Sequence, residues 1–483
     1  MHSATQTLAA RGLRPTPQAL GHRHRHPELR SLTETWGSSK AVALYLDRCQ
    51  IDTPDELVHA VWRQISRRRR TIGKVVDFGA GDGRFARGGQ YSEYLGYEID
   101  WFRCSDVKLP RGASLINRCA FSDAITDADV CLGNPPFVRN QDLPAGWRRR
   151  AAAVIKNRTG VDVSGLANAW QYFALLALAS TKADGIVALV IPYEWVSRPS
   201  ARALRGYIEA NGWEVDTYRL RDETFRQVLT TSSITIIDKR KRTQQWRFFA
   251  ETERHSYASL PSPSGGRRGV LPYLRRATTA QAKVRVTRGL SPGTQAVLTL
   301  TEGQRVRAGL KIGDDVVPCV TSLRRVTSTC RVLTETVFRS RYRDAGAKCW
   351  IIRTDRAPSK RLRTYLDGIP SARYDTATCS AREEWWKFTM PTVPAVVVAS
   401  GFRGQRPKAV VNRVNAIAVG SVSAVFGVPP TRAAALVKAL GAIRVSARIV
   451  AHSSGLLKLE IGQLNSVIQR LAAKPSSART RRR

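Results

Sequence analysis

The stretch Val75-Val76-Asp77-Phe78-Gly79-Ala80-Gly81-Asp82-Gly83 decides the fold that we expect for this chain. A short β-prone run is followed at once by glycines at alternate positions, which is typical of a buried strand that ends in a tight turn. Glycine suits such a turn because a residue without a Cβ atom bends sharply and lets a ligand approach the backbone. The stretch therefore predicts a ligand-binding turn at the carboxyl end of a strand.

Other apolar runs continue an alternation of strands and helices. We expect strands at 95–100, 129–133, 185–192 and 233–237, and a buried helix at 170–179. Strands that alternate with helices predict an α/β fold with a doubly wound, mostly parallel sheet. Ligands bind such sheets beyond the carboxyl ends of the strands, where the glycine turn falls.

The spacing of the three glycines distinguishes between nucleoside cofactors. It departs from the G-x-G-x-x-G/A pattern of nicotinamide-binding proteins, because Arg84 stands where the third glycine or alanine would fall. Asp77, at the end of the strand, can bind an ammonium group, and Glu98, at the tip of the next strand, can accept both ribose hydroxyls. The pattern favours S-adenosylmethionine over NAD, with a tight turn that binds no ligand as the structural alternative.

A second motif, Asn134-Pro135-Pro136-Phe137, follows the strand expected at 129–133. An exocyclic amino group is a poor nucleophile because its lone pair is delocalised into the ring. The Asn134 side-chain oxygen and the Pro135 carbonyl can accept its two N–H bonds and free that lone pair, while the prolines hold the backbone. Phe137 offers a flat face for stacking a base. The motif predicts methyl transfer to an exocyclic nitrogen; the alternative is a Pro-Pro turn with Phe137 in the core.

Composition points to a polyanionic partner. The chain has 78 Lys and Arg against 38 Asp and Glu, a formal net charge of +40 spread along its length. Nucleic acid is the commonest partner of such a chain, although a solvated basic surface is the alternative. The eight cysteines show no metal-ligand spacing, and we interpret His22–His26 as part of a basic arm. No apolar run is long enough for a membrane span, so we expect neither metal nor membrane.

Together these motifs resemble the gamma-type N6-adenine DNA methyltransferases of bacterial restriction–modification systems, whose motifs occur in the same order. The resemblance covers most of residues 50–430 and is closest at 133–139. Asp123 resembles the acid that holds the cofactor's adenine, with Cys119-Ala120-Phe121 as a shifted alignment. The resemblance implies catalytic residues Asn134, Pro135, Pro136 and Phe137, and cofactor-binding residues Thr53, Asp77, Gly79, Ala80, Gly81, Glu98 and Asp123.

The resemblance also implies an organisation and an activity. The fold would be a Rossmann-like S-adenosylmethionine-dependent methyltransferase followed by a mixed α+β target-recognition domain. The activity would be transfer of a methyl group to N6 of an adenine flipped out of double-stranded DNA, with Phe225 or Val228 flanking the base. The expected ranges are a basic arm (1–35), a catalytic domain (36–250), a linker (251–280), a recognition domain (281–472) and a basic tail (473–483).

Because few residues precede the cofactor turn and none suggests a metal-dependent nuclease, we expect a modification enzyme whose cognate restriction endonuclease is separate. We expect it in the bacterial cytoplasm, associated with the nucleoid. Three alternatives remain at this point. They are N4-cytosine methylation, methylation of RNA or of protein glutamine, and a catalytically silent DNA-binding module.

Overall fold

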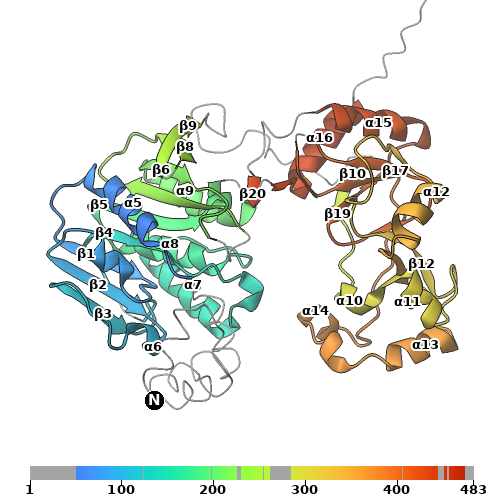
Figure 1. Cartoon of the computed structure of the whole chain (residues 1–483), viewed down its shortest axis with the longest axis horizontal. Coiled ribbons are helices and arrows are strands. Elements are labelled where there is room, and N and C mark those ends of the chain that lie inside the picture. Colours follow the sequence, from blue (N-terminus) through green and yellow to red (C-terminus); the bar gives the residue numbers. More distant parts are fainter. Residues whose placement is uncertain are drawn as a thin grey trace, which may run out of the picture. The chain divides into compact units, whose positions relative to one another are not determined.

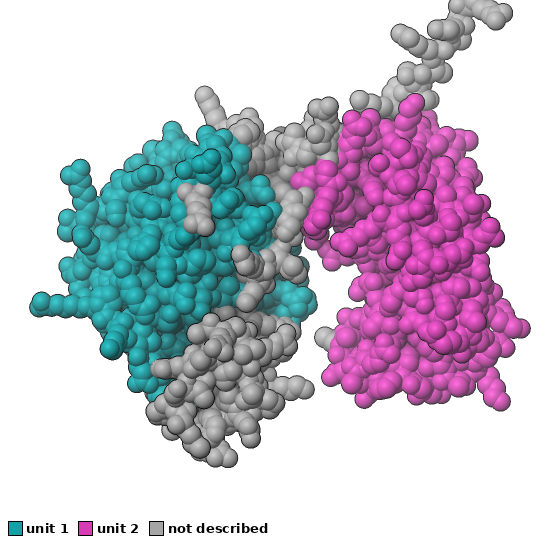
Figure 2. Space-filling view, in the orientation of Figure 1, with its two compact units in different colours: residues 1–270, 452–454 teal, residues 271–451, 455–483 magenta. Residues whose placement is uncertain are grey.

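The computed structural model describes residues 51–122, 125–196, 198–225, 230–253, 255–260, 284–404, 406–443, 451–453 and 456–473. The chain divides into two compact units, residues 1–270 with 452–454 and residues 271–451 with 455–483 (Figure 2). The basic arm expected at 1–35 lies outside the described residues, as do residues 474–483 of the expected tail and 261–283, which contain most of the expected linker.

A nine-stranded sheet forms the centre of the first unit, in the order β3-β2-β1-β4-β5-β7-β6-β8-β9 (Figure 1). Strands β1 to β5 run parallel, whereas β7 pairs antiparallel with both β5 and β6. The strand order reverses between β1 and β4, which is the switch point at which α/β sheets bind ligands. The strands are β1 (Lys74–Phe78), β2 (Glu93–Glu98), β3 (Ala113–Asn117), β4 (Ala128–Gly133), β5 (Thr181–Pro192), β6 (Glu214–Arg219), β7 (Ser232–Asp238), β8 (Trp246–Glu253) and β9 (Ser256–Leu260).

Helices pack against this sheet. Helix α5 buries Leu57, Trp62 and Ile65 in a cluster with Val75 and Val130 of the central strands. Helix α8 is buried almost throughout, as its apolar sequence predicts. The helices of the unit are α5 (Asp55–Ser66), α6 (Trp101–Cys104), α7 (Ala145–Thr159), α8 (Ala169–Ser180) and α9 (Arg202–Ala210), with 3₁₀ turns η1 (Arg84–Arg87), η2 (Asn140–Asp142), η3 (Tyr193–Val196) and η4 (Pro199–Ala201).

The predicted α/β class with a mostly parallel sheet is confirmed, and the strands expected in this unit correspond to β1, β2, β4, β5 and β7. The linker expected from residue 251 begins too early. Residues 251–253 end β8 and residues 256–260 form β9, an antiparallel pair that extends the sheet. Its polar outer residues resemble a loop in sequence, but Phe248 is buried and pairs with Leu260. Strands β3 and β6 were also not expected, since their short polar runs carry little apolar signal.

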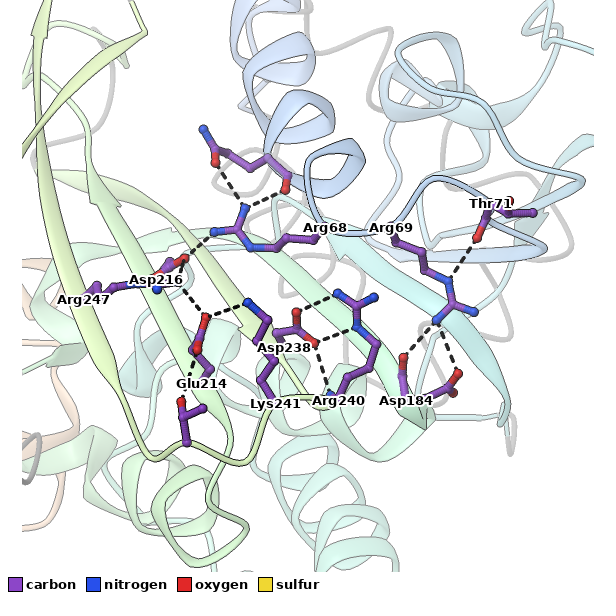
Figure 3. A network of polar contacts seen from close by, with 12 residues as sticks. Arg68, Arg69, Thr71, Asp184, Glu214, Asp216, Asp238, Arg240, Lys241 and Arg247 are labelled. Atoms are coloured by element: carbon purple, nitrogen blue, oxygen red, sulfur yellow. Dashed lines mark hydrogen bonds and ion pairs between the residues drawn. The ribbon is translucent and has the colours of Figure 1, made fainter.

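Ion pairs lie at the end of the sheet where β6 and β8 begin (Figure 3). The buried carboxylate of Asp216 pairs with Arg68 and Arg247. Glu214, also buried, pairs with Arg247 at 2.6 Å and Lys241 at 3.4 Å. Because each buried acid has at least two cationic partners, this network joins the end of α5 to the sheet at low desolvation cost.

Asp129, at the start of β4, extends this pattern. Its Oδ2 accepts hydrogen bonds from the backbone N–H groups of Gly73 (2.9 Å) and Lys74 (2.8 Å). Its Oδ1 accepts from Arg69 (2.9 Å) and Lys182 (3.0 Å). Burial acts to raise the pKa of Asp129, but these donors and charges outweigh it and lower the pKa below its ordinary value. Ion pairs and hydrogen bonds to buried acids thus hold the end of the sheet that lies opposite the glycine turn.

The second unit has two main sheets, in the orders β10-β19-β15-β17-β13 and β11-β14-β12-β18. Its strands are β10 (Arg285–Arg288), β11 (Thr299–Thr301), β12 (Val316–Val320), β13 (Val332–Leu333), β14 (Lys348–Ile352), β15 (Val396–Ala399), β16 (Gly401–Phe402), β17 (Ala409–Asn412), β18 (Ile417–Ala418), β19 (Val422–Phe426) and β21 (Leu456–Lys458), and β20 (Ala451–Ser453) lies at the chain boundary of the units. Its helices are α10 (Gln295–Leu298), α11 (Glu302–Arg307), α12 (Glu335–Phe338), the π-helix η6 (Arg339–Arg343), α13 (Lys360–Asp367), η7 (Ser371–Arg373), α14 (Ala377–Ser380), α15 (Pro430–Ala442) and α16 (Ile461–Ala473).

The mixed α+β character expected for this part of the chain is confirmed. The region expected to be helical at 430–471 contains α15 and α16, but β20 and β21 lie between them. Among the described residues, no helix combines the length and the apolar character needed to cross a bilayer.

Candidate methyltransferase site

The glycine turn after β1 has a backbone that only glycine adopts readily. Gly79, Gly81 and Gly83 have φ angles of +93°, +59° and +69°. The N–H groups of Gly79 and Ala80 both donate to the Tyr97 carbonyl of β2, at 2.8 and 2.9 Å. The turn is thus fastened to the neighbouring strand, and a Cβ atom at these positions would strain it.

Glu98 lies at the end of β2, facing this turn. Its Oε2 accepts a hydrogen bond from Gly81 N–H and its Oε1 one from Asp100 N–H, each at 2.8 Å. Burial raises the pKa of Glu98, an effect that these two donors and the charge of Arg103 oppose. The backbone therefore fixes the direction of the carboxylate, and each oxygen retains lone-pair capacity for a further donor.

Asp77 is fully buried at the end of β1. Its Oδ2 accepts a hydrogen bond from the Tyr94 hydroxyl at 2.7 Å, whereas its Oδ1 has no hydrogen-bond partner. Burial, with a smaller contribution from the charge of Glu98, raises the pKa of Asp77 to about 7. A buried acceptor without a partner is uncommon and indicates a donor that arrives with a ligand.

The Asn-Pro-Pro-Phe segment begins where β4 ends. Gly133 precedes it with a φ of +143°, and an alanine Cβ at this position would lie 2.2 Å from Asp77 Oδ1. Asn134 Nδ2 donates a hydrogen bond to Thr53 Oγ1 at 3.2 Å, across 81 positions of sequence. Pro136 lies against the glycine turn, with its Cδ atom 3.5 Å from a Cβ built on Gly79. The two sequence motifs are therefore adjacent in space, at the switch point of the sheet.

One pocket joins these elements and encloses about 830 Å³, counting space open to solvent. Seven of the residues expected at the site line it, and they come from the glycine turn, the Asn-Pro-Pro-Phe segment, the end of β2 and the residue before Pro54. These residues are Thr53, Gly79, Ala80, Gly81, Glu98, Asn134 and Pro136.

The other expected residues lie off the wall of this pocket or outside the described residues. Asp77 and Pro135 are buried, and Phe137 is half-buried without lining the pocket. Asp123 is outside the described residues, whereas Cys119 and Ala120, from the shifted alignment, line the pocket. Phe225 is buried in the core beside the sheet, and Val228 is outside the described residues.

Sequence analysis did not assign arginines or Asp52 to the pocket. Arg103 and Arg84 line it and both pair with Asp52, Arg84 at 3.1 Å. Arg84 also donates to the Thr53 carbonyl at 3.1 Å, and Arg103 lies over Gly81. No motif marks these residues; the only signal was that Asp52 directly precedes Thr53.

The aromatic part of the wall was also missed. Trp147 of α7 and Phe173 of α8 line the pocket, and each meets Phe121 edge to face, with ring centroids 5.3 and 5.1 Å apart. These rings add apolar surface to a pocket that the carboxylate of Glu98 also lines. A site with one apolar wall and a few fixed polar groups suits a small ligand that has a planar ring.

The segment after Phe137 is fixed by asparagines. Asn168 caps the start of α8, and its Oδ1 accepts a hydrogen bond from Asn140 N–H at 3.0 Å. Asn140 Oδ1 in turn accepts from Arg148 at 3.0 Å, and Ala169 N–H donates to the Val138 carbonyl at 2.9 Å. These bonds join the segment to both α7 and α8, so the backbone that follows Asn134 is held in place.

The strand order, the glycine turn and the carboxylate at the tip of β2 define the class I methyltransferase fold. Residues 99–214 match the family model of the Eco57I restriction-modification methylases. This match agrees with the resemblance expected from the sequence, and this part of the chain is similar to methylases of restriction–modification systems.

One solved structure agrees on the fold, and two others match less well. The type IIL restriction-modification enzyme MmeI, solved in complex with DNA, matches with a TM-score of 0.55 at 11% identity, covering 91% of this chain and 66% of MmeI. The type IIG restriction endonuclease BpuSI matches with a TM-score of 0.42 at 12% identity, covering 91% of this chain and 63% of BpuSI. A type I restriction-modification methyltransferase subunit from Streptococcus thermophilus matches with a TM-score of 0.35 at 15% identity, covering 44% of this chain and 50% of the subunit. The chain thus spans less than two thirds of the length of each of these three proteins.

Proposed function

We propose that this chain transfers a methyl group from S-adenosylmethionine to N6 of an adenine that is flipped out of double-stranded DNA. In this proposal it is the modification enzyme of a restriction–modification system, with a separate cognate endonuclease. The observation that carries the proposal is the adjacency of Asn134, Thr53 and the glycine turn at one pocket. An acceptor for an amino group and a cofactor turn are what this reaction must bring together.

The residues at the pocket fit the cofactor. The oriented carboxylate of Glu98 suits the ribose hydroxyls, and Asp77, which is buried off the pocket wall with its Oδ1 unpartnered, would bind the ammonium group of the methionine part through water. The aromatic side formed by Trp147 and Phe173 suits the adenine ring. Arg84 and Arg103 supply positive charge for the methionine carboxylate. When bound, S-adenosylmethionine supplies an electrophilic methyl group.

The chain's own residues would prepare the amino group. Asn134 uses its amide nitrogen as a donor to Thr53, so its Oδ1 remains available to accept from the amino group of the target base. The Pro135 carbonyl would accept the second N–H bond, and the two prolines leave no competing backbone donor. The lone pair of N6 would then attack the methyl carbon in line, so that an N–C bond replaces the methyl–sulfur bond, S-adenosylhomocysteine leaves as a neutral thioether, and N6 loses one proton to solvent. Positioning, rather than a protein nucleophile, accounts for the rate enhancement.

The second unit would bind the DNA and read the target sequence. The net charge of +40 supplies the phosphate-binding component of the affinity. Flipping of the adenine costs a few kcal/mol, which stacking and backbone contacts offset. An N4-cytosine target uses the same chemistry; Asn rather than Ser before Pro-Pro favours adenine.

The test is expression of the chain in a methylation-free bacterial host, followed by single-molecule sequencing of the host DNA and mass spectrometry of its nucleosides. We expect N6-methyladenine in one short sequence motif, and none with Asn134→Ala. N4-methylcytosine would replace the adenine assignment. Unmodified DNA from a soluble protein that still binds S-adenosylmethionine in calorimetry would reject DNA as the substrate.

A further inference from the structure

A tight turn between β12 and β13 of the second unit holds two arginines at its tip. The turn is Leu323-Arg324-Arg325-Val326, closed by a hydrogen bond from Val326 N–H to the Leu323 carbonyl at 3.3 Å. Leu323 and Val326 are each only 2% exposed and belong to the core of the unit, whereas Arg324 and Arg325 are exposed. Both ends of the turn are therefore anchored by apolar burial, and its two central side chains face solvent.

Lys408 holds the inner side of this turn. Its Nζ donates to the Val326 carbonyl at 2.7 Å and lies 3.4 Å from the carbonyls of both Leu323 and Arg324. An ammonium group that donates to backbone carbonyls holds the backbone in place. Its positive charge is not neutralised, because no carboxylate is its partner.

Two hydroxyl groups fix the residues that lead into the turn. Tyr342, which is buried in η6, donates its hydroxyl to the Ser322 carbonyl at 2.9 Å. Ser421 donates its hydroxyl to the Thr321 carbonyl at 2.8 Å. Side chains from three separate parts of the unit thus donate hydrogen bonds to the backbone carbonyls of this short segment. The backbone of the turn is therefore held more firmly than that of an ordinary surface turn.

The charge at the turn is unbalanced. Within the part of the chain that the structure describes, neither Arg324, Arg325 nor Lys408 has an ion pair with an acid. Two other exposed arginines of the unit do have acidic partners: Arg356 lies 3.8 Å from Asp314, and Arg363 lies 3.5 Å from Glu384. The two exposed guanidinium groups of the turn are therefore available to an anionic partner.

We propose that the turn 323–326 is a preorganised DNA contact of the second unit, in which Arg324 and Arg325 donate to acceptors on the duplex. This inference rests on the proposed function, in which the second unit binds DNA. Arginine donates to phosphate oxygens and, in a bidentate manner, to the O6 and N7 atoms of guanine. A backbone fixed before binding leaves less conformational entropy to lose on association, which is the advantage of anchoring the turn so heavily.

The experiment measures the affinity of the full chain for a labelled random-sequence duplex across a salt titration. We expect Arg324→Ala/Arg325→Ala to weaken binding about tenfold or more at low salt, and to flatten the slope of log K against log salt by about 1 to 2. The matched control is Arg356→Ala/Arg363→Ala, which removes two exposed but ion-paired guanidinium groups from the same unit. Thermal unfolding and S-adenosylmethionine binding should be unchanged in both variants.

Two further variants refine the result. Lys408→Met keeps both arginines but releases the turn, and we expect weaker binding with a slope close to that of the wild type. Arg324→Lys/Arg325→Lys separates two kinds of acceptor. Retained affinity and slope would indicate phosphates, and a changed methylated motif would indicate guanine edges.

The proposal is overturned if Arg324→Ala/Arg325→Ala binds the duplex with the wild-type affinity and slope, or loses no more than the control variant. A wild-type chain that binds duplex DNA but methylates nothing would reject the proposed function, and the salt titration would still decide the role of the turn. A wild-type chain that does not bind duplex DNA would reject both.

Discussion

Asn134 Nδ2 lies 3.2 Å from Thr53 Oγ1, and this hydrogen bond joins the end of β4 to the residue that precedes Pro54 and helix α5. The bond gives the Asn134 amide a defined orientation, with its nitrogen toward Thr53 and its oxygen available to a second donor. Because Thr53 is buried, at 6% exposure, water does not replace it easily as the partner. The orientation of Asn134 therefore depends on a residue distant in sequence.

Removal of this orientation should lower the rate without unfolding the protein. We expect Asn134→Ala to lower kcat by about 100-fold or more, as for the loss of a fixed hydrogen-bonding group at a reacting centre. Thr53→Val keeps the volume but removes the acceptor, and we expect a loss of about tenfold in kcat, or about 1.4 kcal/mol in the barrier. The measurement is single-turnover methylation of the duplex that carries the wild-type motif. An unchanged kcat in Thr53→Val would show that Asn134 needs no partner.

Glu98 should control the affinity for S-adenosylmethionine. In Glu98→Gln an amide N–H₂ group would face the N–H of Gly81 or of Asp100, each of which now donates to a carboxylate oxygen at 2.8 Å. Loss of a hydrogen bond to a charged group costs about 1.5 to 3 kcal/mol, so we expect the Kd to rise by about 10- to 100-fold. Calorimetry gives the Kd. The control is Glu93→Gln, at the exposed start of the same strand, whose Kd should equal that of the wild type.

Asp77 should make both stability and cofactor binding depend on pH. Its pKa is raised from 3.8 to about 7 by burial, so the folded protein binds a proton more tightly than the unfolded chain does. An acid whose pKa is raised in the folded protein destabilises the fold once it ionises. Its contribution to stability therefore falls as the pH rises from about 4 to about 7. The full cost is on the order of 4 kcal/mol, since each pKa unit corresponds to about 1.36 kcal/mol.

Asp77→Asn tests this expectation. Urea unfolding between pH 5 and pH 8 should show a smaller loss of unfolding free energy with rising pH in the variant than in the wild type. If the ammonium group of the cofactor meets the unpartnered Oδ1, binding of S-adenosylmethionine should tighten as Asp77 ionises near pH 7, and Asp77→Asn should abolish that dependence. Equal pH profiles of the two proteins would argue against a role for this carboxylate.

Asp129 should act in the opposite direction. The pKa of Asp129 in the folded protein lies below the ordinary value of 3.8. Asp129 therefore stabilises the fold at pH values above its pKa in the unfolded chain. This stabilisation is lost as the pH falls through its pKa in the folded protein. Asp129→Asn leaves Arg69 and Lys182 without their shared carboxylate, and we expect a loss of about 2 to 4 kcal/mol at neutral pH in urea unfolding. Asp184→Asn is the control, because Asp184 pairs with Arg69 at 3.6 Å but is 66% exposed and should contribute little.

Local features were readable from the sequence alone. The glycines at 79, 81 and 83 require positive φ angles, and such a requirement is written in residue type because other residues are strained there. The strands β1, β4 and β5 contain the apolar runs 75–76, 130–132 and 186–191, since these residues are buried on both faces of the sheet. Asn134 follows β4 directly and Glu98 ends β2, so the parallel sheet brings both residues to the same pocket.

Only the tertiary structure decided which distant residues complete the site. The bond from Asn134 to Thr53, the charges of Arg84 and Arg103 around Asp52, and the aromatic wall of Trp147 and Phe173 depend on packing between elements far apart in the chain. The same holds for the two-arginine turn, whose rigidity comes from Lys408. Apolar periodicity and turn chemistry act over a few residues and can be read locally. The partner of a polar side chain is set by the fold as a whole, because any of many donors and acceptors could satisfy it until the elements pack.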